Sequence, residues 1–125
     1  MNMKKHPELI PSIALTANGI TAFTLDNAAK GPNSAGYDFL SVQVNGTFVA
    51  TGTIEFSNDG TNYLPLSIAT DLSSIATPVG TFTLTGKQLI IPMLARFCRI
   101  RSTAWVSGTA NLVVMGHQGN PKIIL

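Results

Sequence analysis

The segment "YDFLSVQVNGTF", residues 37–48, shows the pattern that decides the fold of this chain. Aliphatic and polar side chains alternate along it. The aliphatic residues are Leu40, Val42 and Val44, and the polar residues are Ser41, Gln43 and Asn45. Because successive side chains of a strand point to opposite faces, this two-residue period is typical of a half-buried β-strand. We expect the aliphatic set to face a hydrophobic core and the polar set to face outward.

Segments of the same type recur along the whole chain. Short runs rich in Thr, Val, Ile and Phe alternate with Gly, Pro, Asn and Asp, and no stretch keeps a helical apolar spacing for three turns. The sequence predicts strands at residues 12–17, 20–26, 37–47, 52–58, 62–68, 80–85, 87–92, 96–103 and 109–116. This pattern predicts an all-β, single-domain antiparallel β-sandwich or jelly roll of about eight strands with extended termini. We expect the sandwich to span residues 12–118, between an N-terminal arm (1–11) and a C-terminal tail (119–125).

Charged side chains are scarce in this sequence. They make up 11% of the 125 residues, against about a quarter in a typical domain, and the net charge is +2. Since protein interfaces are depleted in Lys, Glu and Asp, this composition suits a subunit packed among other subunits. A solitary neutral sandwich would have the same composition. The slight basic excess predicts no nucleic-acid binding, and no apolar run reaches the roughly 20 residues of a membrane span.

Both ends of the chain carry apolar residues where free termini are usually polar. The resulting interface candidates are Pro7, Leu9, Ile10, Pro11, Ile123, Ile124 and Leu125. They can dock on the chain's own sheet as edge strands, or reach a neighbouring subunit as arms that add a strand to its sheet. The sequence leaves both interpretations open.

The segment "SNDGTNYLPL", residues 57–66, raises the question of a metal loop. A calcium loop normally needs several carboxylates, and this segment offers only Asp59. Asp59 followed by Gly60 is instead typical of a tight turn, because glycine accepts the positive φ that such turns require. Ser107 and Gly108 predict a second turn, between the last two expected strands.

No set of residues specifies a catalytic or cofactor site. His6 and His117 lie near the chain ends, and the motifs of serine hydrolases, zinc proteases and phosphate-binding loops are missing from the sequence. In "RFCRIRS", residues 96–102, the lone Cys98 alternates with arginines and shares a face with Ile100, which predicts a small buried hydrophobe rather than a reactive thiol. We expect no enzyme activity, no metal and no cofactor.

Three aromatic residues lie near strand starts or between strands, namely Tyr37, Tyr63 and Trp105. Together with neighbouring Asn and Thr side chains they could form a carbohydrate-binding surface, provided that the rings converge. The sequence favours Trp105 as a cap on one end of the core, since the chain has no other tryptophan to fill an end. A carbohydrate- or receptor-binding module of adhesin or tail-fibre type is therefore the alternative hypothesis for function.

The order of turn and strand motifs resembles a β-sandwich module of tailed-bacteriophage virion proteins. Residues that match its first part are Ser57, Asn58, Asp59, Gly60 and Tyr63, and those that match its second part are Arg99, Ile100, Arg101, Ser107, Gly108 and Thr109. The likeness spans roughly residues 37–116 by the strand pattern, and its motifs are turn and strand signals of moderate specificity. Tyr63 stands where Trp is commoner in that family, and Cys98 where Val or Ile is expected.

The resemblance implies a virion component such as a decoration protein, fibre, connector or tail module. Since the chain is little longer than one module, we expect a head decoration or cement protein, or a small accessory head or tail subunit. Its partners would be other copies of itself, with a homotrimer favoured, and the major capsid protein or other virion proteins. It would be assembled in the host cytoplasm and end in the virion, with neither nucleic acid nor a membrane as a partner.

Overall fold

A computed structural model describes residues 7–28 and 36–119 of the chain. This part forms eight strands: β1 (Glu8–Ile10), β2 (Thr21–Asp26), β3 (Phe39–Ser57), β4 (Leu64–Pro65), β5 (Thr70–Asp71), β6 (Thr81–Phe82), β7 (Lys87–Pro92) and β8 (Phe97–His117). Each strand pair is antiparallel, and no helix occurs in these two stretches. The expectation of an all-β antiparallel fold with about eight strands is thereby confirmed.

The strands belong to one continuous sheet, in which β3 and β8 are the longest elements. The order is β1-β8-β3-β7-β5, with β2 also beside β8 and with β4 and β6 also beside β3. β3 and β8 pair along their whole length, from Phe39 opposite His117 to Ser57 opposite Phe97. Four separate strands expected at 37–47, 52–58, 96–103 and 109–116 are therefore halves of two long strands.

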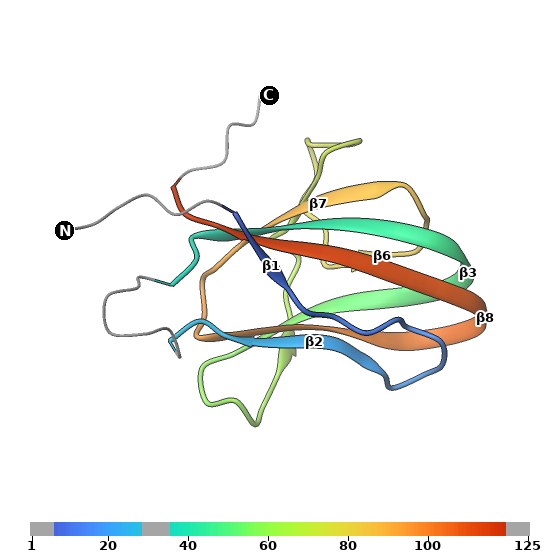
Figure 1. Cartoon of the computed structure of the whole chain (residues 1–125), viewed down its shortest axis with the longest axis horizontal. Coiled ribbons are helices and arrows are strands. Elements are labelled where there is room, and N and C mark those ends of the chain that lie inside the picture. The colour runs from blue at the N-terminus through green and yellow to red at the C-terminus, as the bar shows by residue number, and fades with distance from the viewer. Residues whose placement is uncertain (1–6, 29–35, 120–125) are drawn as a thin grey trace.

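β3 and β8 bend together halfway along their length, so that the sheet folds back over itself (Figure 1). The first layer contains the N-terminal half of β3 and the C-terminal half of β8, flanked by β7 and β1. The second layer contains the other halves, flanked by β2, β4 and β6. The pairing register shifts twice at the bend, between Val49 and Ala50 and between Thr51 and Gly52, as β-bulges do where a strand turns a corner.

Two glycines make this bend possible. Gly46 and Gly108 have φ values of 104° and 89°, in the region that side chains disfavour. A Cβ atom on Gly46 would collide with the carbonyl oxygen of Thr109, and one on Gly108 with that of Thr47. The turn expected at Ser107 and Gly108 is thus wrong: the pair lies inside β8, where the glycine bends the strand without ending it.

The space between the layers is filled by one hydrophobic cluster. Leu40, Val42 and Val44 of the first layer have no exposed surface, which confirms the inward face expected from their alternation. Ile54 and Cys98 of the second layer are equally inaccessible. Burial raises the pKa of the Cys98 thiol to about 12, so this cysteine is a buried hydrophobe as expected.

Several expected strands are shorter than predicted or missing. Residues 12–17 form no strand, because Leu15 pairs only with Ala110, beside the bend, where β8 curves away from the crossing segment. The strands expected at 62–68 and 80–85 shrink to β4 and β6, of two residues each. The sheet also begins at Glu8, inside the segment expected to be an arm.

Candidate interaction surfaces

The N-terminal interface candidates belong to the chain's own sheet or lie beside it. β1 pairs with β8, and Ile10 of β1 is buried in the core. Leu9 points the other way and remains 65% exposed, while Pro7 and Pro11 on either side of β1 are also exposed. Residues 8–10 thus follow the edge-strand interpretation, whereas Ile123, Ile124 and Leu125 lie outside the described residues.

The three aromatic residues of the carbohydrate hypothesis are not brought together. The Tyr37 ring is buried and packs over Gly116, where a Cβ atom would lie 2.6 Å from it. Trp105 lies at the bend, stacked on Phe48 with ring centroids 6.1 Å apart, and its indole N–H donates to the Gly108 carbonyl. Tyr63 is covered on one ring face by Arg99. The three rings have different neighbours, and no ring contact joins any two of them among the described residues.

The Ser57–Gly60 segment forms the expected tight turn. Gly60 has a φ of 77°, and its N–H donates to Ser57 Oγ. The Asp59 carboxylate accepts hydrogen bonds from Ser57 Oγ, the N–H groups of Thr61 and Asn62, and the Asn62 side-chain amide. The bonds from Asn62 and Thr61 hold the pKa of Asp59 well below its usual value. The carboxylate thus serves the turn itself, and the described residues contain no cluster of three potential metal ligands.

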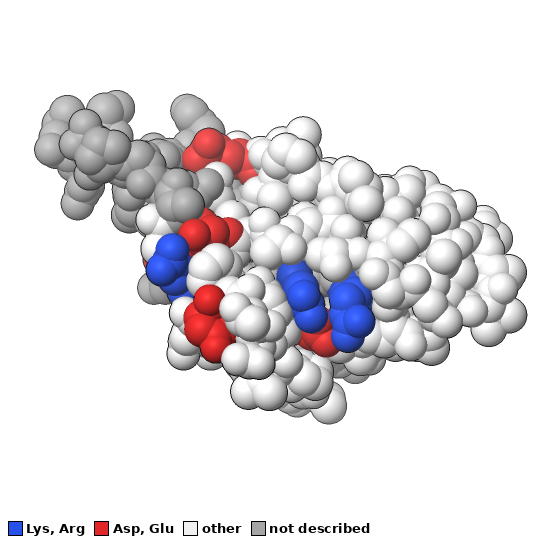
Figure 2. Space-filling view, turned by 90° about the horizontal axis from the view of Figure 1, so that it is seen from below, with Lys and Arg blue, Asp and Glu red and all other residues white. Residues whose placement is uncertain are grey.

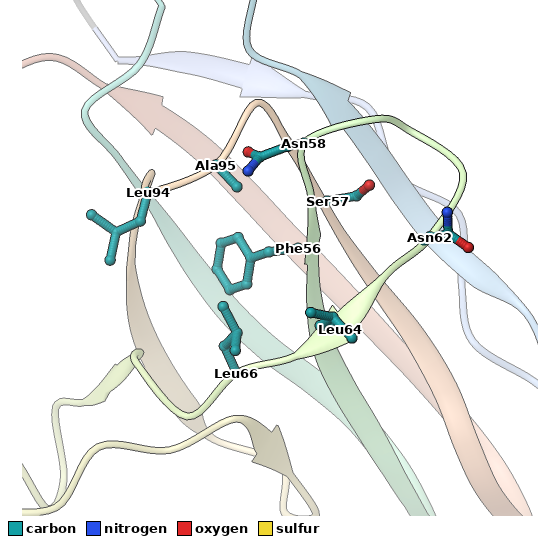
Figure 3. A pocket seen from close by; sticks show the side chains of 8 residues that line it. All are labelled: Phe56, Ser57, Asn58, Asn62, Leu64, Leu66, Leu94 and Ala95. Atoms are coloured by element: carbon teal, nitrogen blue, oxygen red, sulfur yellow. The ribbon is translucent and has the colours of Figure 1, made fainter.

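A small pocket of about 210 Å³ lies beside this turn (Figure 3). Its lining residues are Phe56, Ser57, Asn58, Asn62, Leu64, Leu66, Leu94 and Ala95. The Phe56 ring points into the space between Leu66 and Leu94, while Ser57 points to the other side of the strand (Figure 3). The lining contains no titratable side chain. The pocket is also smaller than typical small-molecule sites, which have volumes of about 300–1,000 Å³. It therefore suits one apolar side chain better than a substrate.

A second surface lies on the outside of the second layer, and we call it the arginine cluster: Glu55 of β3, Arg99 and Arg101 of β8, and Tyr63 from the turn. Arg99 Nε lies 2.7 Å from Glu55 Oε1, and Arg101 Nη2 lies 3.3 Å from Glu55 Oε2. The Arg99 guanidinium carbon lies 3.8 Å from the centre of the Tyr63 ring, in a cation–π contact. Figure 2, which views the molecule from below, shows basic side chains next to acidic ones in a mostly uncharged surface.

Glu55 of this cluster is ionised in spite of its burial. Its side chain is only 7% exposed. Burial by itself raises the pKa of Glu55, but the hydrogen bonds and positive charges of Arg101 and Arg99 more than offset this effect and hold the pKa below its usual value. The sequence pattern places Glu55 and both arginines on outward faces of their strands. It gives no sign that the turn residues cover them.

A third surface, the outside of the first layer, carries no Lys, Arg, Asp or Glu among the residues that the structure describes. We call it the neutral face, and its outward residues are Leu9 of β1, Ser41, Gln43 and Asn45 of β3, Thr70 of β5, Gln88 and Ile90 of β7, and Asn111, Val113 and Met115 of β8. Leu9 and Val113 are 65% and 40% exposed. At its margin the His117 ring stacks on Phe39, and its Nε2 lies 2.8 Å from Ser41 Oγ. Sequence alternation correctly predicts the outward residues of β3. It does not predict which residues of the other strands lie beside them.

Comparison with known proteins gives a likeness of fold and none of sequence. No protein-family model matches the chain, and no curated protein matches it by sequence. Among solved structures, the crystal structure of the SPBc2 prophage-derived protein YomS superimposes with a TM-score of 0.66, over 92% of this chain and 98% of that one, at 8% sequence identity. The chain therefore shares its fold with a prophage-derived protein. No helix in the described residues is long and apolar enough to cross a membrane.

Proposed function

We propose that this chain is a non-enzymatic structural protein of a tailed-phage virion, either a head decoration or cement protein or a small accessory head or tail subunit. It assembles as a homo-oligomer, with a trimer favoured, and binds the major capsid protein or other virion proteins. We interpret the folded sheet as a sandwich-type scaffold whose value lies in the contacts of its outer surfaces.

The observation that carries the proposal is the neutral face. An antiparallel sheet face in contact with water normally mixes charged side chains of both signs, which keep a free domain soluble and separate from its copies. Five strands contribute outward side chains to the neutral face, and none of those side chains is a Lys, Arg, Asp or Glu. Protein interfaces show the same depletion of charge, so the face fits contact with another subunit.

The mechanism is burial of surface, helped by symmetry. Exposed apolar residues such as Leu9 and Val113 would each contribute up to about 1.5–3 kcal/mol if a partner buried them fully. Repeated contacts in a symmetric oligomer add to one another, because the second contact forms within an assembled particle. The likeness of fold to a prophage-derived protein supports a phage setting.

The experiment is to look for the chain in particles. Antibodies against the purified chain should label phage particles from the bacterium that carries its gene, at regular positions on the head or tail in immunogold electron microscopy. Particles that contain no copy of the chain, by labelling and by mass spectrometry of their proteins, would contradict the proposal.

The terminal arms are tested in the same assay with two truncations. One variant lacks residues 1–6 and the other lacks residues 120–125, so that β1 and the rest of the sheet remain intact. If an arm fastens the subunit, its removal reduces attachment while the isolated domain keeps its thermal stability. Full attachment of both variants would reject the arms and leave the sheet faces as the binding surfaces.

A further inference from the structure

The arginine cluster has an excess of positive charge that the other ion pairs of the described chain lack. Lys87 is paired with Asp71 at 3.0 Å, and Arg96 donates twice to Asp26 at 3.0 Å. These are pairs of one cation and one anion. In the arginine cluster, two guanidinium groups share the single carboxylate of Glu55, and neither forms an ion pair with a second carboxylate among the described residues.

The two arginines also have N–H groups that make no hydrogen bond to the described residues. Arg99 binds Glu55 through Nε, and its two terminal amino groups make no hydrogen bond to the described residues. Arg101 uses Nε and Nη2, which leaves Nη1. Their side chains are 25% and 37% exposed, so the remaining donors are accessible from solvent. A guanidinium carries five N–H donors in a planar fork that matches the oxygens of carboxylate and phosphate groups.

The surroundings hold the guanidinium groups in place. Glu55 is fixed within β3, opposite Arg99 and next to Thr53, which pairs with Arg101. The Tyr63 ring supports the Arg99 guanidinium from one side. Because the carboxylate and the ring already order both side chains, a ligand would lose less free energy to the ordering of flexible arginines.

Hydroxyl groups border the same surface. Thr24 of β2 pairs with Arg99 and is exposed. The hydroxyl groups of Thr53 and Thr103 lie 2.7 Å apart and bond to each other. Thr24 thus adds an accessible donor on the side of Arg99 that faces away from Glu55.

We propose that the arginine cluster is a binding site for an oxyanion, that is, a phosphate or carboxylate group carried by a partner molecule. The anion occupies the solvent side of Arg99 and Arg101 and binds through their remaining N–H groups, while Glu55 keeps the two forks oriented. This site is separate from the neutral face and does not depend on the proposed virion role.

The test is a titration followed by NMR on the full chain, at constant ionic strength balanced with chloride. Inorganic phosphate and acetate are added in separate series, and the Nε–H signals of the arginines are observed. We expect saturable shifts for Arg99 and Arg101 and none for Arg96, whose charge Asp26 already neutralises. Saturation by phosphate alone, by acetate alone or by both supports the site and identifies the group it prefers.

Two variants of Arg101 and one control variant of Arg96 define the outcome. Arg101→Gln should weaken binding at least about tenfold, as expected for the loss of a hydrogen bond to a charged group, whereas the matched Arg96→Gln should leave it unchanged. Arg101→Lys keeps the charge but loses the planar fork, so binding should weaken severalfold in a chain that retains its ion pair. No saturable shift in either series, equal shifts at Arg96, or full binding by Arg101→Lys and Arg101→Gln would overturn the proposal.

Discussion

The two outer faces of the folded sheet share their two longest strands, β3 and β8, and differ in what covers them. On the neutral face, the outward polar residues of β3 remain accessible, and Gln43 is exposed. On the second layer, the outward residues Thr53, Glu55 and Ser57 are buried to 7%, 5% and 4% exposure. Ion pairs and the Ser57–Tyr63 turn cover that side, whereas the described residues leave most of the neutral face at least partly exposed, with Ile90 as its buried member.

The difference shows that one alternating pattern can serve two purposes. In the second layer the outward side chains stabilise the domain, because a buried carboxylate must be paired. In the first layer the outward side chains make few side-chain hydrogen bonds to the described part of the chain, so they are available to a partner. Substitutions on the two faces should therefore have opposite signatures: loss of stability on one, loss of contact on the other.

The bend that sets the two faces back to back gives the largest expected effect. Gly108→Ala should lower the free energy of unfolding by about 3 kcal/mol or more, because it adds a side chain at positive φ and a collision with the Thr47 carbonyl. Urea unfolding followed by fluorescence measures it. The control is Gly86→Ala, which has a similar φ of 77° but no neighbour within 4 Å, and should cost about 1–2 kcal/mol. Equal costs would mean that the close approach at the bend is unimportant.

The next effect lies in the arginine cluster. Glu55→Gln should destabilise the domain by about 1–3 kcal/mol, since two arginines lose their shared anion in a largely buried place. Arg96→Gln removes a charge from an ion pair whose arginine is 52% exposed, and should cost no more than about 1 kcal/mol. Chemical denaturation of both variants checks the contrast. An unchanged free energy of unfolding in Glu55→Gln would show that the arginine cluster contributes nothing to the stability of the fold.

The loss of stability at acid pH should depend on the same residue, Glu55. The folded-state pKa of Glu55 lies below its unfolded value, so the unfolded chain binds the proton more readily. The stabilisation is present above the usual Glu pKa of about 4.3 and is lost as pH falls through the folded-state pKa. Urea midpoints between neutral pH and pH 3 should fall less steeply in Glu55→Gln than in the original chain. If both chains lose stability equally steeply as the pH falls, Glu55 is not the group responsible. The Asp59 carboxylate of the turn would then account for the loss of stability in acid.

The smallest effect on stability is expected on the neutral face. Gln43→Ala should change the free energy of unfolding by less than about 0.5 kcal/mol, because the one side-chain hydrogen bond of this exposed residue to the described residues is to Asn45. Thermal unfolding of the dilute protein measures it. A loss of more than about 1 kcal/mol at a concentration where the chain is monomeric would show that the face stabilises the domain itself.

The sequence predicts local features of this fold well. The alternation at residues 39–45 places Leu40, Val42 and Val44 in the core, and Asp59 and Gly60 form the turn that their chemistry favours. Cys98 is buried, as its alternation with arginines indicates. These features depend on the period of two and on the φ preference of glycine, both of which are written in adjacent residues.

Features that depend on contacts between distant parts of the chain could not be predicted from the sequence. Ser107 and Gly108 have the composition of a turn, yet Gly108 bends a strand that continues, because its partner β3 bends at the same place. Glu55 has the outward position of a solvated residue, and only the pairing of β3 with β8 brings both arginines to it, while the folded turn brings Tyr63 to Arg99. Residues 12–17 have strand composition, but the curvature of β8 leaves Leu15 with a single partner.

The central claim, that the neutral face is a contact surface between subunits, is tested most directly by the mass of the protein in solution. Val113 lies in the middle of that face and is 40% exposed, so Val113→Glu adds a charge without touching the core. In sedimentation equilibrium over a range of concentrations, the original chain should have the mass of an oligomer, a trimer by our proposal, and Val113→Glu should be a folded monomer. A monomeric original chain at high concentration, or a Val113→Glu variant that assembles equally well, would contradict the account.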